Sequence, residues 1–307
     1  ATLGGSAMNI TEKVNNKNKF KLYGWAGLGL IIFAEAALVF HKRGCEAAHG
    51  LCAWTTPICW AGYLLFIDSV IYKIKGNSII NNRRKEFFVQ IPLSIVFWLM
   101  FEVYNLHLKN WEYMGLPLDN LFVLCIGMAV AFGAIMPGLL MTGELIEALR
   151  VFERFRITKL NVNNRVVYGG IVLGFLFVMF PLLLGENIAK YLFGFVWVGF
   201  VMIFDPIVYA SKKGDSLLKD LEDGVLGRIL SLFAAGLICG FLWEFWNYWS
   251  LSKWVYKAPF TQGIKIFEMP LIGFIGFAPF AWEYFAFYSF CKLFITTQVD
   301  RLKAEDF

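Results

Sequence analysis

Long apolar runs constrain this chain more than any other feature of its sequence. Several runs of about 18 to 24 residues are apolar on every face, the length that an α-helix needs to cross the roughly 30 Å hydrocarbon layer of a membrane. With 58% hydrophobic residues, the chain is also more apolar than an ordinary soluble domain. We therefore predict an all-α, polytopic membrane helix bundle with about eight transmembrane helices, at 22–40, 54–73, 87–107, 119–146, 166–184, 190–210, 226–249 and 269–295.

Basic residues between these runs predict the orientation. Alternate connections carry clusters of lysine and arginine, at 73–85, 150–159 and 212–219, and the N-terminal tail is basic as well. Because positively charged loops stay on the cytoplasmic side, we expect an integral protein of a bacterial cytoplasmic membrane with both termini in the cytoplasm. The loops account for the net charge of +5, so nucleic acid is not expected as a partner.

A repeated order of polar and aromatic residues divides the chain into two halves, about 140 residues apart. The matched pairs are Trp60 and Trp197, Asp68 and Asp205, Tyr72 and Tyr209, Glu102 and Glu244, Asn105 and Asn247, Trp111 and Trp254, Tyr113 and Tyr256, and Pro117 and Pro259. Because each unit has an even number of spans, this duplication predicts two parallel tandem repeats. The expected segments are a tail at 1–21 with an expression scar before Met8, a first repeat at 22–149, a linker at 150–165, a second repeat at 166–296 and a tail at 297–307.

Carboxylates and amides inside the apolar runs are the candidate catalytic groups. A charged side chain is costly in hydrocarbon, so it is paired, protonated or used. The candidates for general acid–base chemistry are Glu102, Asn105, Glu244, Asn247 and Glu283. In each half the Glu and the Asn are three residues apart and share a helix face, so the structural alternative is that each Asn hydrogen-bonds its Glu and ties helices together.

Two aspartates occupy matching positions nearer the basic loops. Asp68 and Asp205 are assigned a structural role, either as partners of the nearby lysines or as caps of a neighbouring helix.

Aromatic residues surround the carboxylates and are the candidate substrate-binding residues: Trp111, Trp243, Trp246, Trp254, Tyr256 and Trp282. Their faces suit an apolar ligand and can stabilise a developing cation. The histidines and cysteines match no metal-ligand spacing, so no metal is expected, and the sequence does not identify a cofactor. Cys45 and Cys52 share one short outer connection, in which a disulfide is an open alternative.

The order of these residues resembles that of the lycopene-cyclase membrane domain of carotenoid biosynthesis. The residues that carry the resemblance are Trp243, Glu244, Trp254, Tyr256, Glu268, Pro270 and Glu283, with Glu102, Trp111, Tyr113 and Pro117 in the first half. The resemblance covers the third, fourth, seventh and eighth spans. It implies a duplicated unit of about three spans, in which intramembrane acids protonate a polyene.

Three functions are consistent with these features. The first is an isoprenoid- or lipid-processing enzyme, of the cyclase or isomerase kind, that uses intramembrane carboxylates as general acid and base in an aromatic-lined cavity. The second is a proton-coupled transporter or lipid-handling protein. The third is a non-catalytic pigment- or quinone-binding subunit of a membrane complex. The expected ligand is a membrane lipid or an isoprenoid, and a homo-oligomer or a membrane complex remains an open alternative.

Overall fold

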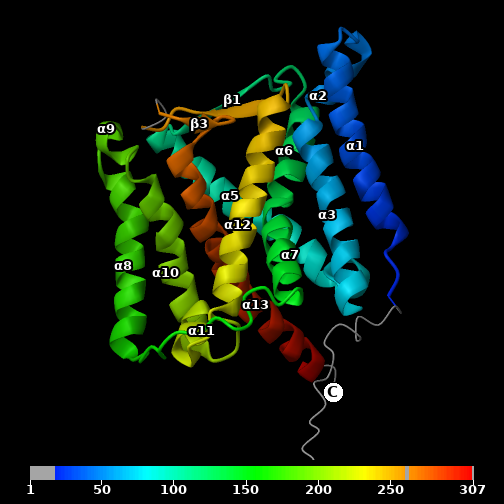
Figure 1. Ribbon diagram of the computed structural model, residues 1–307. Coiled ribbons are helices and arrows are strands. Elements are labelled where there is room, and N and C mark those ends of the chain that lie inside the picture. Colours follow the sequence, from blue (N-terminus) through cyan, green and yellow to red (C-terminus); the bar gives the residue numbers. More distant parts are fainter. Residues whose placement is uncertain (1–17, 260–262, 306–307) are drawn as a thin grey trace, which may run out of the picture.

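The chain is a bundle of long helices that run back and forth between two ends (Figure 1). The computed structural model describes residues 18–259 and 263–305. Within these residues, seven spans are long and apolar enough to cross a membrane, which confirms the all-α polytopic bundle. They are α1 (Leu22–Lys42), α3 (Thr55–Lys75), α5 (Arg84–Leu108), α6 with α7 (Leu121–Gly133 and Ile135–Ala148), α8 (Asn164–Leu183), α10 (Phe193–Ser211) and α12 (Gly227–Trp249).

Short elements join the spans at both ends of the bundle. One end carries a two-stranded ribbon of β1 (Trp111–Met114) and β2 (Lys253–Tyr256), and we call it the ribbon end. The other end carries α11 (Leu217–Asp223), and we call it the α11 end. The remaining short elements are η2 (Glu46–Ala48), α2 (His49–Cys52), α4 (Ile79–Asn82), α9 (Glu186–Ala189), β3 (Lys265–Ile266), β4 (Met269–Pro270) and η3 (Leu271–Gly276).

The predicted span 119–146 is one crossing made of two helices. Pro137 lacks an N–H, and its ring would clash with the carbonyl of Gly133, so the helix breaks at Ala134 between α6 and α7. The hydroxyl of Ser94, on α5, is inserted into this break. It donates to the carbonyl of Phe132 at 2.5 Å and accepts from the N–H of Met136 at 2.9 Å, so both freed backbone groups keep a partner.

The last predicted span, 269–295, is only partly correct. Residues 269–276 form β4 and the 3₁₀ helix η3, and the α-helix begins at Phe277 as α13 (Phe277–Glu305). This helix has 29 residues, but it is not among the seven spans of the described chain that are long and apolar enough to cross a membrane. Its start packs so closely on α12 that a Cβ on Gly236 would lie 2.1 Å from the carbonyl oxygen of Phe277. The α-helix therefore begins at the point where Phe277 packs on α12, eight residues later than predicted.

The two helix pairs α1–α3 and α8–α10 cross at glycines in the same way. A Cβ on Gly27 would lie 2.4 Å from the carbonyl oxygen of Gly62. A Cβ on Gly174 would lie 2.7 Å from the carbonyl oxygen of Gly199. Close approach of two backbones at small residues is how membrane helices gain contact area without a hydrophobic driving force.

Asp68 and Asp205 cap short helices at the α11 end, so the capping alternative is the one that the structure adopts. Asp68 accepts from the backbone N–H of Ile80 at 2.9 Å and also binds two hydroxyls. Asp205 accepts from the N–H groups of Leu217 and Leu218 at 2.7 and 2.8 Å. A carboxylate at a helix N-terminus satisfies N–H groups that have no partner within the helix.

The two cysteines in the connection between α1 and α3 are not joined. Cys45 is exposed, Cys52 is buried, and both are free thiols, so the alternative of a disulfide is not realised.

Candidate functional site

The ribbon pairs two segments in which tryptophan and tyrosine follow the same order. Strands β1 and β2 pair antiparallel, with Trp111 opposite Tyr256 and Tyr113 opposite Trp254. Trp111 matches Trp254 in the other half and Tyr113 matches Tyr256, so each of these two pairs joins a tryptophan of one half to a tyrosine of the other. A local two-fold relation therefore passes through the centre of the ribbon, which joins two segments that are far apart in the sequence.

An asparagine ties each strand to the helix before it. Asn105 donates to the carbonyl of Trp111 at 2.8 Å and accepts from its N–H at 3.1 Å. Asn247 does the same with Trp254, at 2.8 and 2.9 Å. The structural alternative, in which each Asn hydrogen-bonds its Glu, is therefore not the arrangement found. An amide offers a donor and an acceptor side by side, which matches the N–H and C=O of one extended residue better than it matches a carboxylate.

The two glutamates accept hydrogen bonds from aromatic side chains instead. Glu102 Oε1 accepts from the hydroxyl of Tyr113 at 2.5 Å and from the indole N–H of Trp98 at 2.8 Å. Glu244 Oε1 accepts from the hydroxyl of Tyr256 at 2.7 Å. Glu244 is fully buried, and its second oxygen has no hydrogen-bond partner in the part of the chain that the structure describes. Each half thus holds a tyrosine–glutamate pair.

Both tyrosines of these pairs lie on the ribbon, outside the spans. Burial, followed by the charge of the neighbouring carboxyl group, raises the pKa of Tyr113 and of Tyr256 well above the usual value of 10.0. Both phenol groups therefore keep their protons throughout the physiological pH range.

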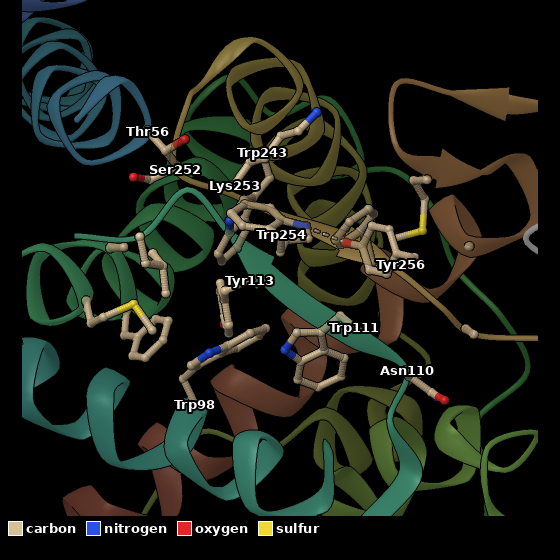
Figure 2. A pocket seen from close by; sticks show the side chains of 18 of the residues that line it. Thr56, Trp98, Asn110, Trp111, Tyr113, Trp243, Ser252, Lys253, Trp254 and Tyr256 are labelled. Carbon is tan, nitrogen blue, oxygen red and sulfur yellow. Dashed lines mark hydrogen bonds between the residues drawn. The ribbon is translucent and has the colours of Figure 1, made fainter. Parts of the chain in front are cut away.

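A cavity of about 440 Å³ lies beneath the ribbon. Side chains from α5 and both strands gather around it, and Trp98, Trp111 and Tyr113 point into the same space (Figure 2). The wall is mainly aromatic and aliphatic, with contributions from α3, α6, α10, α12, η3 and the start of α13. Its aromatic residues are Trp54, Trp98, Trp111, Tyr113, Phe132, Tyr191, Phe193, Trp197, Trp243, Trp254, Tyr256, Phe277 and Phe280.

A few polar groups interrupt this apolar wall. Asn110 and Thr56 are both buried, and Asn110 Oδ1 and Thr56 Oγ1 have no hydrogen-bond partner among residues 18–259 and 263–305. Lys190 and Lys253 also line the cavity, and Lys253 forms an ion pair of 2.7 Å with Glu268. The cavity can therefore take an apolar body together with a hydrogen-bonding group.

The structure separates the predicted site residues into those on the cavity wall and those behind it. Trp111, Trp243, Trp254 and Tyr256 line the cavity. The candidate acid–base residues Glu102, Asn105, Glu244, Asn247 and Glu283 do not: the first four stand one layer behind the aromatic wall, and Glu283 is buried on α13.

Two predicted binding residues lie elsewhere in the bundle. Trp246 packs against Trp60, with ring centroids 5.3 Å apart, and Trp282 donates its indole N–H to the carbonyl of Ile229 at 2.8 Å. Neither lines the cavity, because their places on α12 and α13 turn them toward other helices.

Most residues at the cavity were absent from the predicted site, and Tyr113, Trp98 and Asn110 are the ones among them that the argument uses. Tyr113 could have been chosen from its match with Tyr256, and Trp98 from its position four residues before Glu102, on the same helix face. Asn110 follows the end of α5, and nothing in the sequence distinguishes it.

Residues 18–259 and 263–305 contain no group of three or more His, Cys, Asp or Glu side chains that could bind a metal ion together. Comparison with known protein families, curated proteins and solved structures finds no match to this chain.

Proposed function

We propose that this integral membrane protein is an isoprenoid- or lipid-processing enzyme, and that its ligand occupies the cavity beneath the ribbon. The observation that carries the proposal is the pair of tyrosine hydroxyls on an aromatic wall, each hydrogen-bonded to a glutamate behind it. A volume of about 440 Å³ is within the range of small-molecule sites, and the apolar wall suits a lipid-soluble ligand.

The tyrosine–glutamate pairs supply a route for acid–base chemistry that does not need a carboxylate at the ligand. When Glu244 is protonated, its O–H can donate to the Tyr256 oxygen while the Tyr256 O–H donates to the ligand. The O–H bond of Glu244 breaks as a new one forms at the Tyr256 oxygen, and the original Tyr256 O–H bond breaks as a bond to hydrogen forms at the ligand. The negative charge ends on the carboxylate and the positive charge on the ligand. Glu102 and Tyr113 provide the same arrangement in the first half. The faces of Trp111, Trp243 and Trp254 can stabilise a cation formed by such a proton transfer.

The remaining sequence predictions form part of this proposal. Matching hydrogen bonds at Asn105 and Asn247, and at Asp68 and Asp205, support two tandem repeats that arose by duplication. The basic clusters at 73–85, 150–159 and 212–219 all belong to connections at the α11 end, which supports a cytoplasmic location for that end and for both termini. The resemblance to the lycopene-cyclase domain agrees with the isoprenoid class of ligand.

A second function is a non-catalytic pigment- or quinone-binding subunit. The observation that favours it is the position of the carboxylates, which lie behind the wall and do not touch the cavity. In that case the aromatic residues hold the ligand, and the tyrosine–glutamate pairs only fix the ribbon.

The test begins with organic-solvent extraction of the purified protein and identification of the bound lipid by mass. The extracted lipid is then incubated with the protein, and its conversion is followed by the same method. We expect the double variant Y113F/Y256F to retain the lipid but lose conversion, whereas the control W282F, altered outside the cavity, keeps both.

Each outcome separates the two functions. Wild-type conversion by Y113F/Y256F would refute the acid–base role of the tyrosines. A bound lipid that no preparation converts would favour the binding subunit. A protein that carries no lipid, and binds none when isoprenoids or phospholipids are added, would refute both functions.

A further inference from the structure

Several buried polar atoms without partners meet where α5 packs against α13. Both carboxyl oxygens of Glu283, the hydroxyl of Tyr284 and Oε1 of Gln90 have no hydrogen-bond partner within the described residues. Glu283 and Tyr284 are fully buried, and Gln90 is 2% exposed. Buried polar groups in proteins nearly always have a partner, because leaving one unsatisfied costs about 1–3 kcal/mol. Because several such atoms lie at one interface, a ligand or water molecules are needed there to supply their hydrogen-bond partners.

These atoms continue a polar column that starts at the α11 end of the bundle. On α5, Glu86, Gln90 and Ser94 are four residues apart and therefore lie on one face of the helix. On α13, Tyr284 and Tyr288 have the same spacing. Exposure falls along the column, since the side chain of Glu86 is 39% exposed while Ser94 is fully buried.

Electrostatic contacts join the two sides of this column. Tyr288 lies near the side chain of Gln90. The charges of Glu86 and Arg83, at the α11 end, also act on Tyr288. Tyr284 lies near both Ser94 and Glu283. The hydroxyl of Ser94 already bridges the break between α6 and α7, so Ser94 supports the column rather than carrying protons.

Glu283 ends the column directly below the cavity. It follows Phe280 by three residues on α13, and Phe280 lines the cavity. The ring centroids of Phe280 and Tyr284 are 4.9 Å apart. The charge of Glu283 acts on the phenols of Tyr104 and Tyr284, and no described lysine, arginine or histidine pairs with it. Because an isolated carboxylate in an apolar interior is far more costly than a neutral carboxyl group, this is a place to hold a proton rather than a fixed charge.

We propose that Glu283 is a proton-exchange site that is loaded from the α11 end along Glu86, Gln90, Tyr288 and Tyr284, with water molecules completing the chain. A proton that arrives forms an O–H bond at Glu283, and the matching O–H bond breaks at the neighbouring carrier, so no oxidant or reductant is involved. Exchange at Glu283 does not depend on the proposed function. The use of this proton to restore the tyrosine–glutamate pairs rests on that function.

Infrared spectroscopy of the whole protein in lipid nanodiscs tests the exchange directly. The carbonyl stretch of a protonated carboxyl group shifts when the proton is replaced by deuterium, and the variant E283Q identifies the band that belongs to Glu283. If E283Q does not fold, E283D identifies the same band by moving it. We expect wild-type protein to show this band near neutral pH and to exchange it rapidly after transfer to D₂O.

Two conservative variants interrupt the column, and one tyrosine variant serves as the control. We expect Q90L and Y288F to slow exchange at Glu283 by about tenfold or more, which corresponds to a barrier raised by about 1.4 kcal/mol. Y63F removes a hydroxyl that binds Thr142 at 2.8 Å, away from the column, and should leave the rate unchanged.

The absence of any band assignable to Glu283 would overturn the proposal, and so would wild-type exchange rates in both Q90L and Y288F. Neither result depends on lipid conversion. Failure of this inference is therefore distinguishable from failure of the proposed function.

Discussion

Replacing Asn247 with alanine should destabilise the protein more than most single substitutions, because this side chain anchors the ribbon. Asn247 is fully buried and makes two hydrogen bonds to the backbone of Trp254, at 2.8 and 2.9 Å. Alanine leaves one N–H and one C=O without partners, and at roughly 1.5 kcal/mol for each group the expected loss is about 3 kcal/mol.

Asn105 provides an internal comparison for this estimate. It makes three hydrogen bonds, two to Trp111 and one to the N–H of Asn110, but it is only half-buried. Because water can replace part of what is lost, N105A should cost less than N247A, about 1–2 kcal/mol. The two strands pair with each other, so the double variant should cost less than the sum of the single variants.

Reversible unfolding in mixed detergent micelles, followed by tryptophan fluorescence, measures these free energies. The matched control is N81A, since Asn81 is only partly buried and its amide makes a solvent-exposed hydrogen bond to Asn82. The reasoning fails if N247A and N81A have the same unfolding free energy. It also fails if the double variant costs the full sum, because the strands would then act independently.

Two further predictions concern helix packing and pH. The variant G236A should disrupt the contact between α12 and α13 and lower the melting temperature, because its Cβ would lie 2.1 Å from the carbonyl oxygen of Phe277. The control G29A should melt like wild type, because its Cβ would have no atom within 4 Å. At the α11 end, burial raises the pKa of Asp220 from its usual 3.8 to about 6, against the opposing charge of Arg228. The folded state therefore binds this proton more tightly, and the stability from Asp220 is full below pH 3.8 and lost as the pH rises through about 6. Melting temperatures between pH 4 and pH 7 should fall less steeply in D220N than in wild type, and equal slopes would contradict the assignment.

The spans themselves follow from the sequence, because the free energy of placing a residue in hydrocarbon is largely a property of that residue. Several local features follow in the same way. Pro137 accounts for the break between α6 and α7, and the carboxylates of Asp68 and Asp205 could be expected near helix N-termini. The start of α13 did not follow, because the apolar composition of 269–276 is the same whether it forms a helix or the β4 and η3 segment.

The residues of the candidate site depended on tertiary structure more than the membrane spans did. Trp243 and Trp246 stand three residues apart on α12, yet only Trp243 lines the cavity. The rotation of a helix that is apolar on all faces is decided by its packing partners, since hydrophobicity does not distinguish one face from another. The choice of tyrosine as the partner of each glutamate also required the ribbon, which places Tyr113 and Tyr256 above helices that end several residues earlier.

By itself, the sequence determined that this chain is a membrane bundle with carboxylates and amides at matching places in the apolar segments of its two halves. Only the tertiary structure decided that Asn105 and Asn247 anchor backbone, that Glu102 and Glu244 stand behind tyrosines, and that Glu283 has no partner among the described residues. The physical reason is that burial depends on local composition, whereas a hydrogen bond depends on which donor and acceptor the packing of distant segments brings within about 3 Å.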